Sequence, residues 1–130
     1  REVRVEHDLC EALPPVMADK NQLLQVLLNL MLNAAQAMET NRPDDRELLL
    51  QSRAAGSHVE VIVRDGGLGI DPDQIDRLFE PFFTTKPHGM GMGLGVCRAI
   101  VKDHEGRIRA ENNPDRGAAF VLGLPVVNHG

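Results

Sequence analysis

The chain has 130 residues, a size typical of one domain and sufficient to bury a core without disulfide or metal crosslinks. Hydrophobic residues make up 42% and charged residues 25%, which is typical of a soluble globular protein. The net charge of −5 and the absence of Trp and Tyr argue against nucleic acid as a partner.

Residues 23–35 form the longest apolar stretch, but Gln25, Asn29 and Asn33 interrupt it. This stretch is too short and too polar to span a bilayer, so we expect a cytoplasmic domain without direct membrane contact. The two cysteines, Cys10 and Cys97, have no metal-type spacing and are expected to be buried free thiols.

The first quarter of the chain predicts a strand followed by a long helix. Residues 1–9 alternate polar and apolar, which indicates a strand with one buried face, and residues 16–18 are expected to form a second, short strand. Asp19 followed by Gln22 has the pattern of a capping box, and the helix is expected to run to about residue 40.

The predicted helix has two distinct faces. Its apolar stripe consists of Leu23, Val26, Leu27, Leu30, Met31, Ala34 and Met38. By their spacing of three and four residues, Asn29, Asn33 and Gln36 lie together on another face.

The rest of the chain alternates strands with short helices. Strands are predicted at residues 47–53, 58–64, 107–111 and 118–124, and helices at residues 72–77 and 96–104. A turn is expected near Gly56, and Gly106 is a plausible C-cap. Residues 1–130 therefore predict a single α/β sandwich domain, in which helices cover one face of a mixed, mostly antiparallel sheet.

Residues 65–97 carry the most informative patterns: D-G-G-L-G-I, then F-E-P-F-F-T-T-K-P, then G-M-G-M-G-L-G-V-C. Alternating glycines let backbone N–H groups approach an anion closely, and a helix start adds its dipole. This is the chemistry of a triphosphate site, and Asn29 and Asn33 could face it from their helix.

In order and spacing, these segments resemble the catalytic ATP-binding (HATPase_c, or GHKL) domain of sensor histidine kinases. Residues 29–37 are similar to the N box, 65–70 to the G1 box, 79–86 to the F box, 89–95 to the G2 box and 117–120 to the last glycine box. The F-F-T-T-K sequence and the short segment between the F box and the G2 box, the lid, look closest to those of the oxygen- and nitrogen-sensing kinases. The resemblance implies the Bergerat ATP-binding fold.

The resemblance assigns roles to particular residues. Asn33 would be the Mg²⁺ ligand, since one amide oxygen suits an ion that takes water and phosphate oxygens for the rest. Asp65 would accept a hydrogen bond from the adenine amino group. Asn29 stands where related ATPases have a Glu that activates water, and an amide is no general base at neutral pH.

Further nucleotide contacts follow from the same boxes. The implied catalytic residues are Asn29 and Asn33, and the implied nucleotide-binding residues are Asn33, Asp65, Gly67, Gly69, Ile70, Lys86, Gly89, Gly91, Gly93, Leu94 and Gly95. The backbone N–H groups of the second glycine loop would hold the triphosphate. Lys86 would meet phosphate as a point charge, and a solvated surface lysine without that role fits its position nearly as well.

The chain departs from the family at four positions. Gly95 stands where the family often has Ser or Ala, which is a tolerable change. Gly66 replaces the usual Asn or Thr, Ala119 stands where a Thr often reaches toward adenine, and Gln36 replaces a frequent Lys or Arg. The adenine contact at Ala119 is expected to be missing. Gly66 leaves one polar contact near the ribose or phosphates open, and the role of Gln36 is open as well. Residues 84–92 are expected to form a lid that orders with nucleotide, and Phe79, Phe82 and Phe83 to anchor it.

The resemblance implies a protein-histidine kinase module that uses ATP and Mg²⁺. It would donate the γ-phosphoryl to a histidine on a separate dimerisation domain, with a response regulator as an indirect partner. None of the five histidines has an acceptor context. A nucleotide sensor without kinase activity, a GHKL-type ATPase and an anti-sigma-type serine kinase remain as alternatives.

Overall fold

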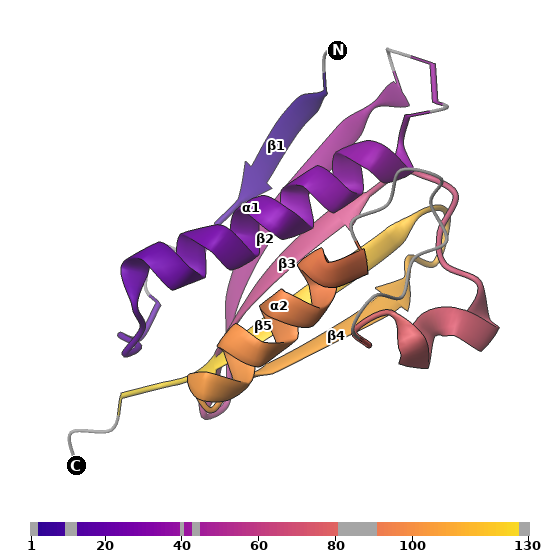
Figure 1. Cartoon of the computed structure of the whole chain (residues 1–130). Helices are drawn as coiled ribbons and strands as arrows, with labels where there is room; N and C mark the ends of the chain where they lie inside the picture. Colours follow the sequence, from indigo (N-terminus) through magenta and orange to yellow (C-terminus); the bar gives the residue numbers. More distant parts are fainter. Residues whose placement is uncertain (1–2, 10–12, 40, 43–44, 81–90, 128–130) are drawn as a thin grey trace.

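The computed structural model describes residues 3–9, 13–39, 41–42, 45–80 and 91–127 (Figure 1). Five strands form one sheet in the order β1-β2-β3-β5-β4. Their bounds are β1 (Arg4–Asp8), β2 (Glu47–Ala55), β3 (His58–Asp65), β4 (Arg107–Asn112) and β5 (Ala118–Pro125). Only β1 and β2 pair parallel, and the other neighbours are antiparallel.

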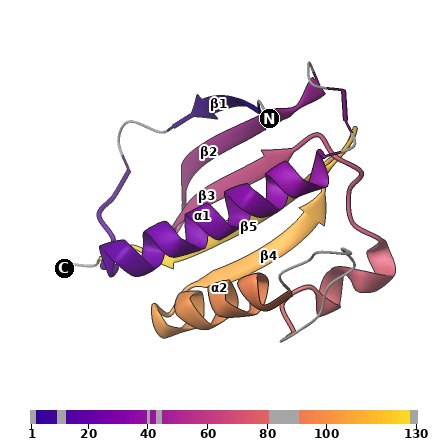
Figure 2. The same ribbon diagram turned by 45° about the horizontal axis from the view of Figure 1, so that its top comes forward.

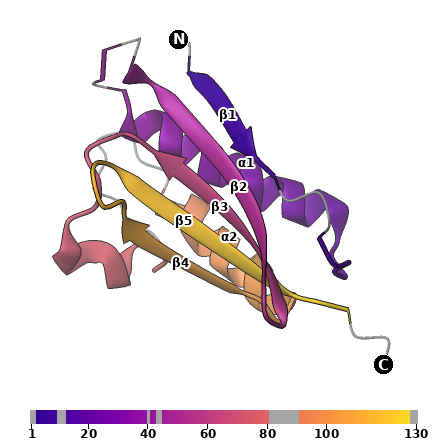
Figure 3. The same ribbon diagram turned by 180° about the vertical axis from the view of Figure 1, so that it is seen from behind.

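The helices α1 (Lys20–Ala37) and α2 (Gly91–Asp103) cover the same face of this sheet. Seen from behind, the sheet lies in front of both helices (Figure 3). A 3₁₀ helix, η2 (Pro72–Arg77), follows β3 and lies beyond the sheet end where β3 stops (Figures 1 and 2). The predicted α/β sandwich with a mixed, mostly antiparallel sheet is confirmed.

Helix α1 begins where its capping signal predicts. The side chain of Asp19 accepts a hydrogen bond from the Gln22 N–H at 3.0 Å, which satisfies one of the donors that a helix start leaves without a partner. The helix ends at Ala37, three residues earlier than expected, and the Met38 N–H bonds back to Ala35.

The core lies between the two helices and the inner face of the sheet. It contains four residues of the α1 stripe, and alternate residues of the strands meet them, as the two-residue period of a strand requires. Its buried members are Val26, Leu30, Ala34, Met38, Leu48, Val63, Cys97, Val101, Phe120, Leu122 and Leu124.

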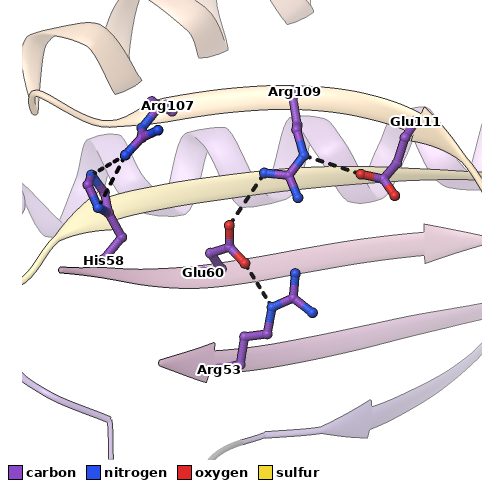
Figure 4. Close-up of polar contacts among 6 residues, drawn as sticks. All are labelled: Arg53, His58, Glu60, Arg107, Arg109 and Glu111. Atoms are coloured by element: carbon purple, nitrogen blue, oxygen red, sulfur yellow. Dashed lines mark hydrogen bonds and ion pairs between the residues drawn. The ribbon is translucent and has the colours of Figure 1, made fainter. Parts of the chain in front are cut away.

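The outer sheet face has a small apolar cluster of its own, formed by Ile62, Ala119 and Val121. No helix covers it. Charged side chains of the same face form a row across β2, β3 and β4 (Figure 4). Glu60 lies at its centre and accepts from Arg53 at 2.7 Å and from Arg109 at 3.4 Å.

The hydrogen bond from Arg53 holds the pKa of the Glu60 carboxyl below its usual value. Arg109 also contacts Glu111, with 3.2 Å between Nε and Oε1. The apolar stems of such long side chains can cover hydrophobic surface while their heads stay in water. We interpret the row as the cover of the outer apolar cluster.

Three details differ from expectation. All five residues of β1 are exposed, because β1 is an edge strand and α1 packs on β2 and β3. Residues 16–18 form no strand, and only an isolated bridge joins Val16 to Val126.

The end of α2 is the third difference. Glu105, with φ of 59°, takes the left-handed conformation expected of Gly106. Gly106 is needed for space instead, since a Cβ there would lie 3.1 Å from the Val101 side chain and closer still to the Gly123 carbonyl.

His104 joins the ends of the two helices. Its Nε2 accepts from the Asp19 N–H at 3.0 Å, and its Nδ1 donates to the Ile100 carbonyl at 2.8 Å. In the part of the chain that the structure describes, no helix has both the length and the apolar character needed to cross a bilayer.

Candidate functional site

A cavity of about 110 Å³ lies where α1, η2, the start of α2, the end of β3 and the start of β5 converge. It brings together five of the predicted site residues, Asn33, Asp65, Gly69, Ile70 and Leu94. The other lining residues are Ala37, Asp71, Gln74, Leu78, Ala118 and Phe120. The cavity therefore has an apolar wall with a few polar groups, as small-molecule sites commonly do.

Asp65 is the buried carboxylate of this site, with 4% of its surface exposed. It ends β3, and its position in the strand points it to the helix side of the sheet. Its Oδ1 accepts from the Gly67 N–H at 2.9 Å and from the Ala118 N–H at 3.2 Å. These bonds offset the cost of burying the carboxylate and fix its orientation.

The glycines after Asp65 are required for two different physical reasons. A Cβ on Gly67 would lie 2.8 Å from the carbonyl carbon of Ala37 and closer still to its oxygen, so the loop touches the end of α1. Gly69 has φ of 83°, which L side chains rarely adopt. Gly66 meets only the Asp45 oxygen at 4.0 Å, so a larger residue has room there.

The two asparagines of α1 have different surroundings. Asn33 is half-buried and lines the cavity. Asn29 is not among the lining residues and lies near Cys97 of α2, whose thiol donates to the Val26 carbonyl at 3.8 Å. Burial raises the pKa of the Cys97 thiol, and the nearby Asn29 amide offsets only part of that effect. Cys97 is thus the free, buried thiol predicted from the sequence, whereas Cys10 lies outside the described residues.

Helix α2 begins at Gly91, five residues before its predicted start at residue 96. Gly91, Gly93 and Gly95 are therefore helical and not part of a loop, and Leu94 of the first turn lines the cavity. The first N–H groups of any helix lack partners within it, so these amides remain suited to an anion. Lys86 and Gly89 lie outside the described residues.

The last glycine box corrects one expectation. Ala119 lies on the outer sheet face with Ile62 and Val121, whereas Ala118 lines the cavity. Neighbouring residues of a strand point to opposite faces, so the position from which a side chain would reach the cavity is 118. The predicted loss of a contact at Ala119 was therefore placed one residue too late.

Phe79 makes an edge-to-face contact with Phe120, with ring centroids 6.1 Å apart. Phe79 thus packs on the core, and its role as an anchor of the lid stays a prediction. Phe82, Phe83, His88 and most of the predicted lid lie outside the described residues. Gln36 is exposed on α1 and does not line the cavity.

Sequence reasoning missed a set of polar residues around the loop 65–70. Asn41, Asn112, Asn113 and Arg116 donate hydrogen bonds to its backbone carbonyls. Their sequence signal is weak, since an Asn pair before Pro114 reads as an ordinary turn between strands.

Comparison with known sequences gives relatives along nearly the whole chain. Sensor histidine kinase ZraS of Escherichia coli (strain K12) is 40% identical over 126 residues, which cover 97% of this chain and 26% of ZraS. Sensor protein FixL of Bradyrhizobium diazoefficiens is 45% identical over 114 residues, which cover 87% of this chain and 22% of FixL. The chain thus spans about a quarter of the length of these relatives.

Solved structures share the fold. Full-length ShkA in complex with AMPPNP superposes with a TM-score of 0.82 at 29% identity, covering 98% of this chain and 26% of ShkA. Histidine kinase ThkA in complex with the response regulator protein TrrA gives a TM-score of 0.78 at 31% identity, covering 96% of this chain and 34% of ThkA. The model of the histidine kinase-, DNA gyrase B- and HSP90-like ATPase family matches residues 18–128, and the chain belongs to this family.

Proposed function

We propose that residues 1–130 are the catalytic ATP-binding domain of a longer sensor histidine kinase. In this proposal the domain binds Mg²⁺-ATP in the cytoplasm and donates the γ-phosphoryl to a histidine of a separate dimerisation domain. The observation that carries the proposal is the cavity at the end of the sheet, where Asp65, Asn33 and the start of α2 converge. The membership in the ATPase family and the sensor-kinase relatives support it.

Asp65 is suited to recognise adenine. Its Oδ1 is held by two backbone N–H groups, so the carboxylate keeps one orientation at the cavity wall. A carboxylate only accepts hydrogen bonds, which matches the amino group of adenine and not the carbonyl that guanine has there. We infer that Asp65 selects ATP over GTP.

Asn33 fits the Mg²⁺ ion that the proposal requires. It offers one neutral amide oxygen from a helix that borders the cavity, and the described residues contain no cluster of three His, Cys, Asp or Glu that could hold a metal. Mg²⁺ takes most of its ligands from water and phosphate, so one amide oxygen from the protein is sufficient. When bound, the ion would neutralise charge on the phosphates.

The glycine-rich start of α2 would hold the triphosphate. Helix N-termini bind phosphate through N–H groups without an intrahelical partner, and Leu94 places this turn at the cavity. Positioning and charge stabilisation then account for most of phosphoryl transfer, which demands little covalent chemistry from the protein.

Hydrolysis by the domain itself is less favoured. Asn29 does not line the cavity, and an amide cannot serve as a base for water. The transfer partners are inferred from what similar proteins do, ThkA having been solved with a response regulator. We therefore propose a dimerisation domain as the direct partner and a response regulator as the indirect one.

Calorimetric titration with ATP, with and without Mg²⁺, tests the site. The native chain should bind ATP more tightly with Mg²⁺, and Asn33→Ala should lose that gain while its fold is unchanged. Asn21→Ala, an exposed change in the first turn of the same helix, is the matched control. Unchanged Mg²⁺ dependence in Asn33→Ala would exclude Asn33 as the ligand.

A further inference from the structure

Side chains from other segments hold the backbone of the loop 65–70. Four of its carbonyl oxygens accept hydrogen bonds from them: Asp65 from Asn113 at 2.9 Å, Gly66 from Asn41 at 3.0 Å, Gly67 from Arg116 at 3.2 Å and Ile70 from Asn112 at 2.8 Å. A loop usually leaves such groups to water. Here side chains of the protein satisfy these carbonyl groups and hold the loop in place.

Asn112 binds one residue of the loop at two points. Its Oδ1 accepts from the Ile70 N–H at 2.7 Å, and its Nδ2 donates to the Ile70 carbonyl at 2.8 Å. The side-chain amide thus pairs with Ile70 as a neighbouring strand would. Gly69, directly before, has room for no side chain, since a Cβ there would lie 2.9 Å from the Asn112 oxygen.

Asn113 holds the other end of the loop. Its Nδ2 lies 2.9 Å from the Asp65 carbonyl, 3.0 Å from that of Arg116 and 3.3 Å from that of Ala118. Its Oδ1 accepts from Arg64 at 2.9 Å. Asn113 therefore ties the end of β3 to the turn that leads into β5.

The end of β4 explains how two consecutive residues reach both ends of one loop. Asn112 has the same strand parity as Ile108 and Ala110, which pack against the core on the helix side. Asn113 follows directly and points the other way, toward Arg64 on the outer face. The pair thus holds the loop from both sides of the sheet.

We propose that Asn112 and Asn113 are positioning residues of the nucleotide site. They keep Asp65 and Ile70 at the cavity wall, while neither asparagine lines the cavity itself. This inference rests on the proposed function. The inference goes beyond the proposed function because it attributes the rigidity of the loop 65–70 to the turn between β4 and β5.

The expected effect is a loss of preorganisation. Without the two Asn112 bonds, the loop must be ordered when the nucleotide binds, and that cost lowers affinity. The loss of about one net hydrogen bond corresponds to about a five- to tenfold weaker affinity. Because the loop contacts the base in this account, ATP, ADP and AMP should weaken by the same factor.

The test compares Asn112→Ala and Asn113→Ala with the native chain and with Asn21→Ala. Affinities for ATP, ADP and AMP are measured by calorimetry at a temperature where every variant is folded, and exchange of the Ile70 amide is followed by NMR. We expect equal weakening for the three nucleotides, faster exchange of the Ile70 amide in Asn112→Ala, and no change in Asn21→Ala. Asn112→Asp keeps an acceptor but loses the donor, and it takes the place of Asn112→Ala if that variant does not fold.

Two results would overturn the proposal. One is a lower melting temperature with unchanged nucleotide affinity, which would make the asparagines purely structural. The other is a loss confined to ATP, which would move their effect to the phosphates. If the native chain binds no ATP, the proposed function fails, and the exchange of the Ile70 amide alone then decides whether Asn112 holds the loop.

Discussion

Substituting Gly67 tests whether the loop 65–70 needs its close approach to α1. Gly67 and its neighbour Gly66 both lie outside the left-handed region, so alanine can adopt either backbone conformation. At Gly67 the new methyl would lie 2.8 Å from the carbonyl carbon of Ala37 and 3.2 Å from its Cβ. At Gly66 the nearest atom is the Asp45 oxygen at 4.0 Å.

The two substitutions should therefore differ in their effect on the free energy of unfolding. Overpacking against backbone atoms costs about 1–3 kcal/mol, so Gly67→Ala should lower the free energy of unfolding by about 2 kcal/mol. For a domain of this size that corresponds to a melting temperature lower by about 6–10 °C. Gly66→Ala should be neutral or stabilise by about 0.5 kcal/mol, because alanine restricts the unfolded chain.

Thermal unfolding and ATP titration of both variants give the answer. Gly67→Ala should also bind ATP more weakly, since the displaced loop carries Asp65 with it, whereas Gly66→Ala should keep the native affinity. Equal melting temperatures and equal affinities in the two variants would refute the argument that contact with Ala37 sets the loop position.

Three further predictions follow from the site and the sheet. Asp65→Asn keeps an oxygen for the two backbone N–H groups but weakens the acceptor for adenine. The fold should therefore persist, and calorimetry should show strongly reduced ATP affinity. Equal ATP and GTP affinities in the native chain would contradict the assigned role. Ala118→Thr places a hydroxyl at the cavity wall and should change ATP affinity several-fold, whereas Ala119→Thr on the outer face should not, as competition binding can show. The Glu60 carboxyl has a lowered pKa, so its stabilising effect is present above the usual carboxylate range and is lost as pH falls through that lowered pKa. Glu60→Gln should accordingly lose less stability than the native chain between about pH 6 and pH 3 in thermal melts, and parallel curves would contradict this.

Much of the fold could be predicted because its local signals agree with one another. The capping pattern at Asp19 and the seven-residue apolar stripe placed α1, and the alternation of the four later strands placed the sheet. Where a signal was local, as with the hydrogen bond from Gln22 to Asp19, the structure confirms it. The exposure of β1 could not be predicted from local sequence signals, because it depends on which strands the helices cover.

The candidate site could be predicted only in part. Glycine boxes indicated Asp65, Gly69 and Ile70, and the cavity brings them together. The one-residue error between Ala118 and Ala119 arose because a motif does not state which strand face lies inward. The contacts of Asn112 join residues 42 positions apart, and no periodicity within either segment reports such a pairing.

Transfer of radiolabelled phosphate tests the central claim most directly. The domain is incubated with γ-labelled ATP and Mg²⁺, alone and with the dimerisation domain that we propose as its direct partner. We predict a stable complex without appreciable hydrolysis or self-labelling when it is alone, because Asn29 supplies no base and no histidine here has an acceptor context. With the partner present, the label should move to the partner's histidine. Rapid phosphate release by the domain alone, abolished by Asn33→Ala, would place it among the ATPases, and tight binding without transfer in either reaction would make it a nucleotide sensor.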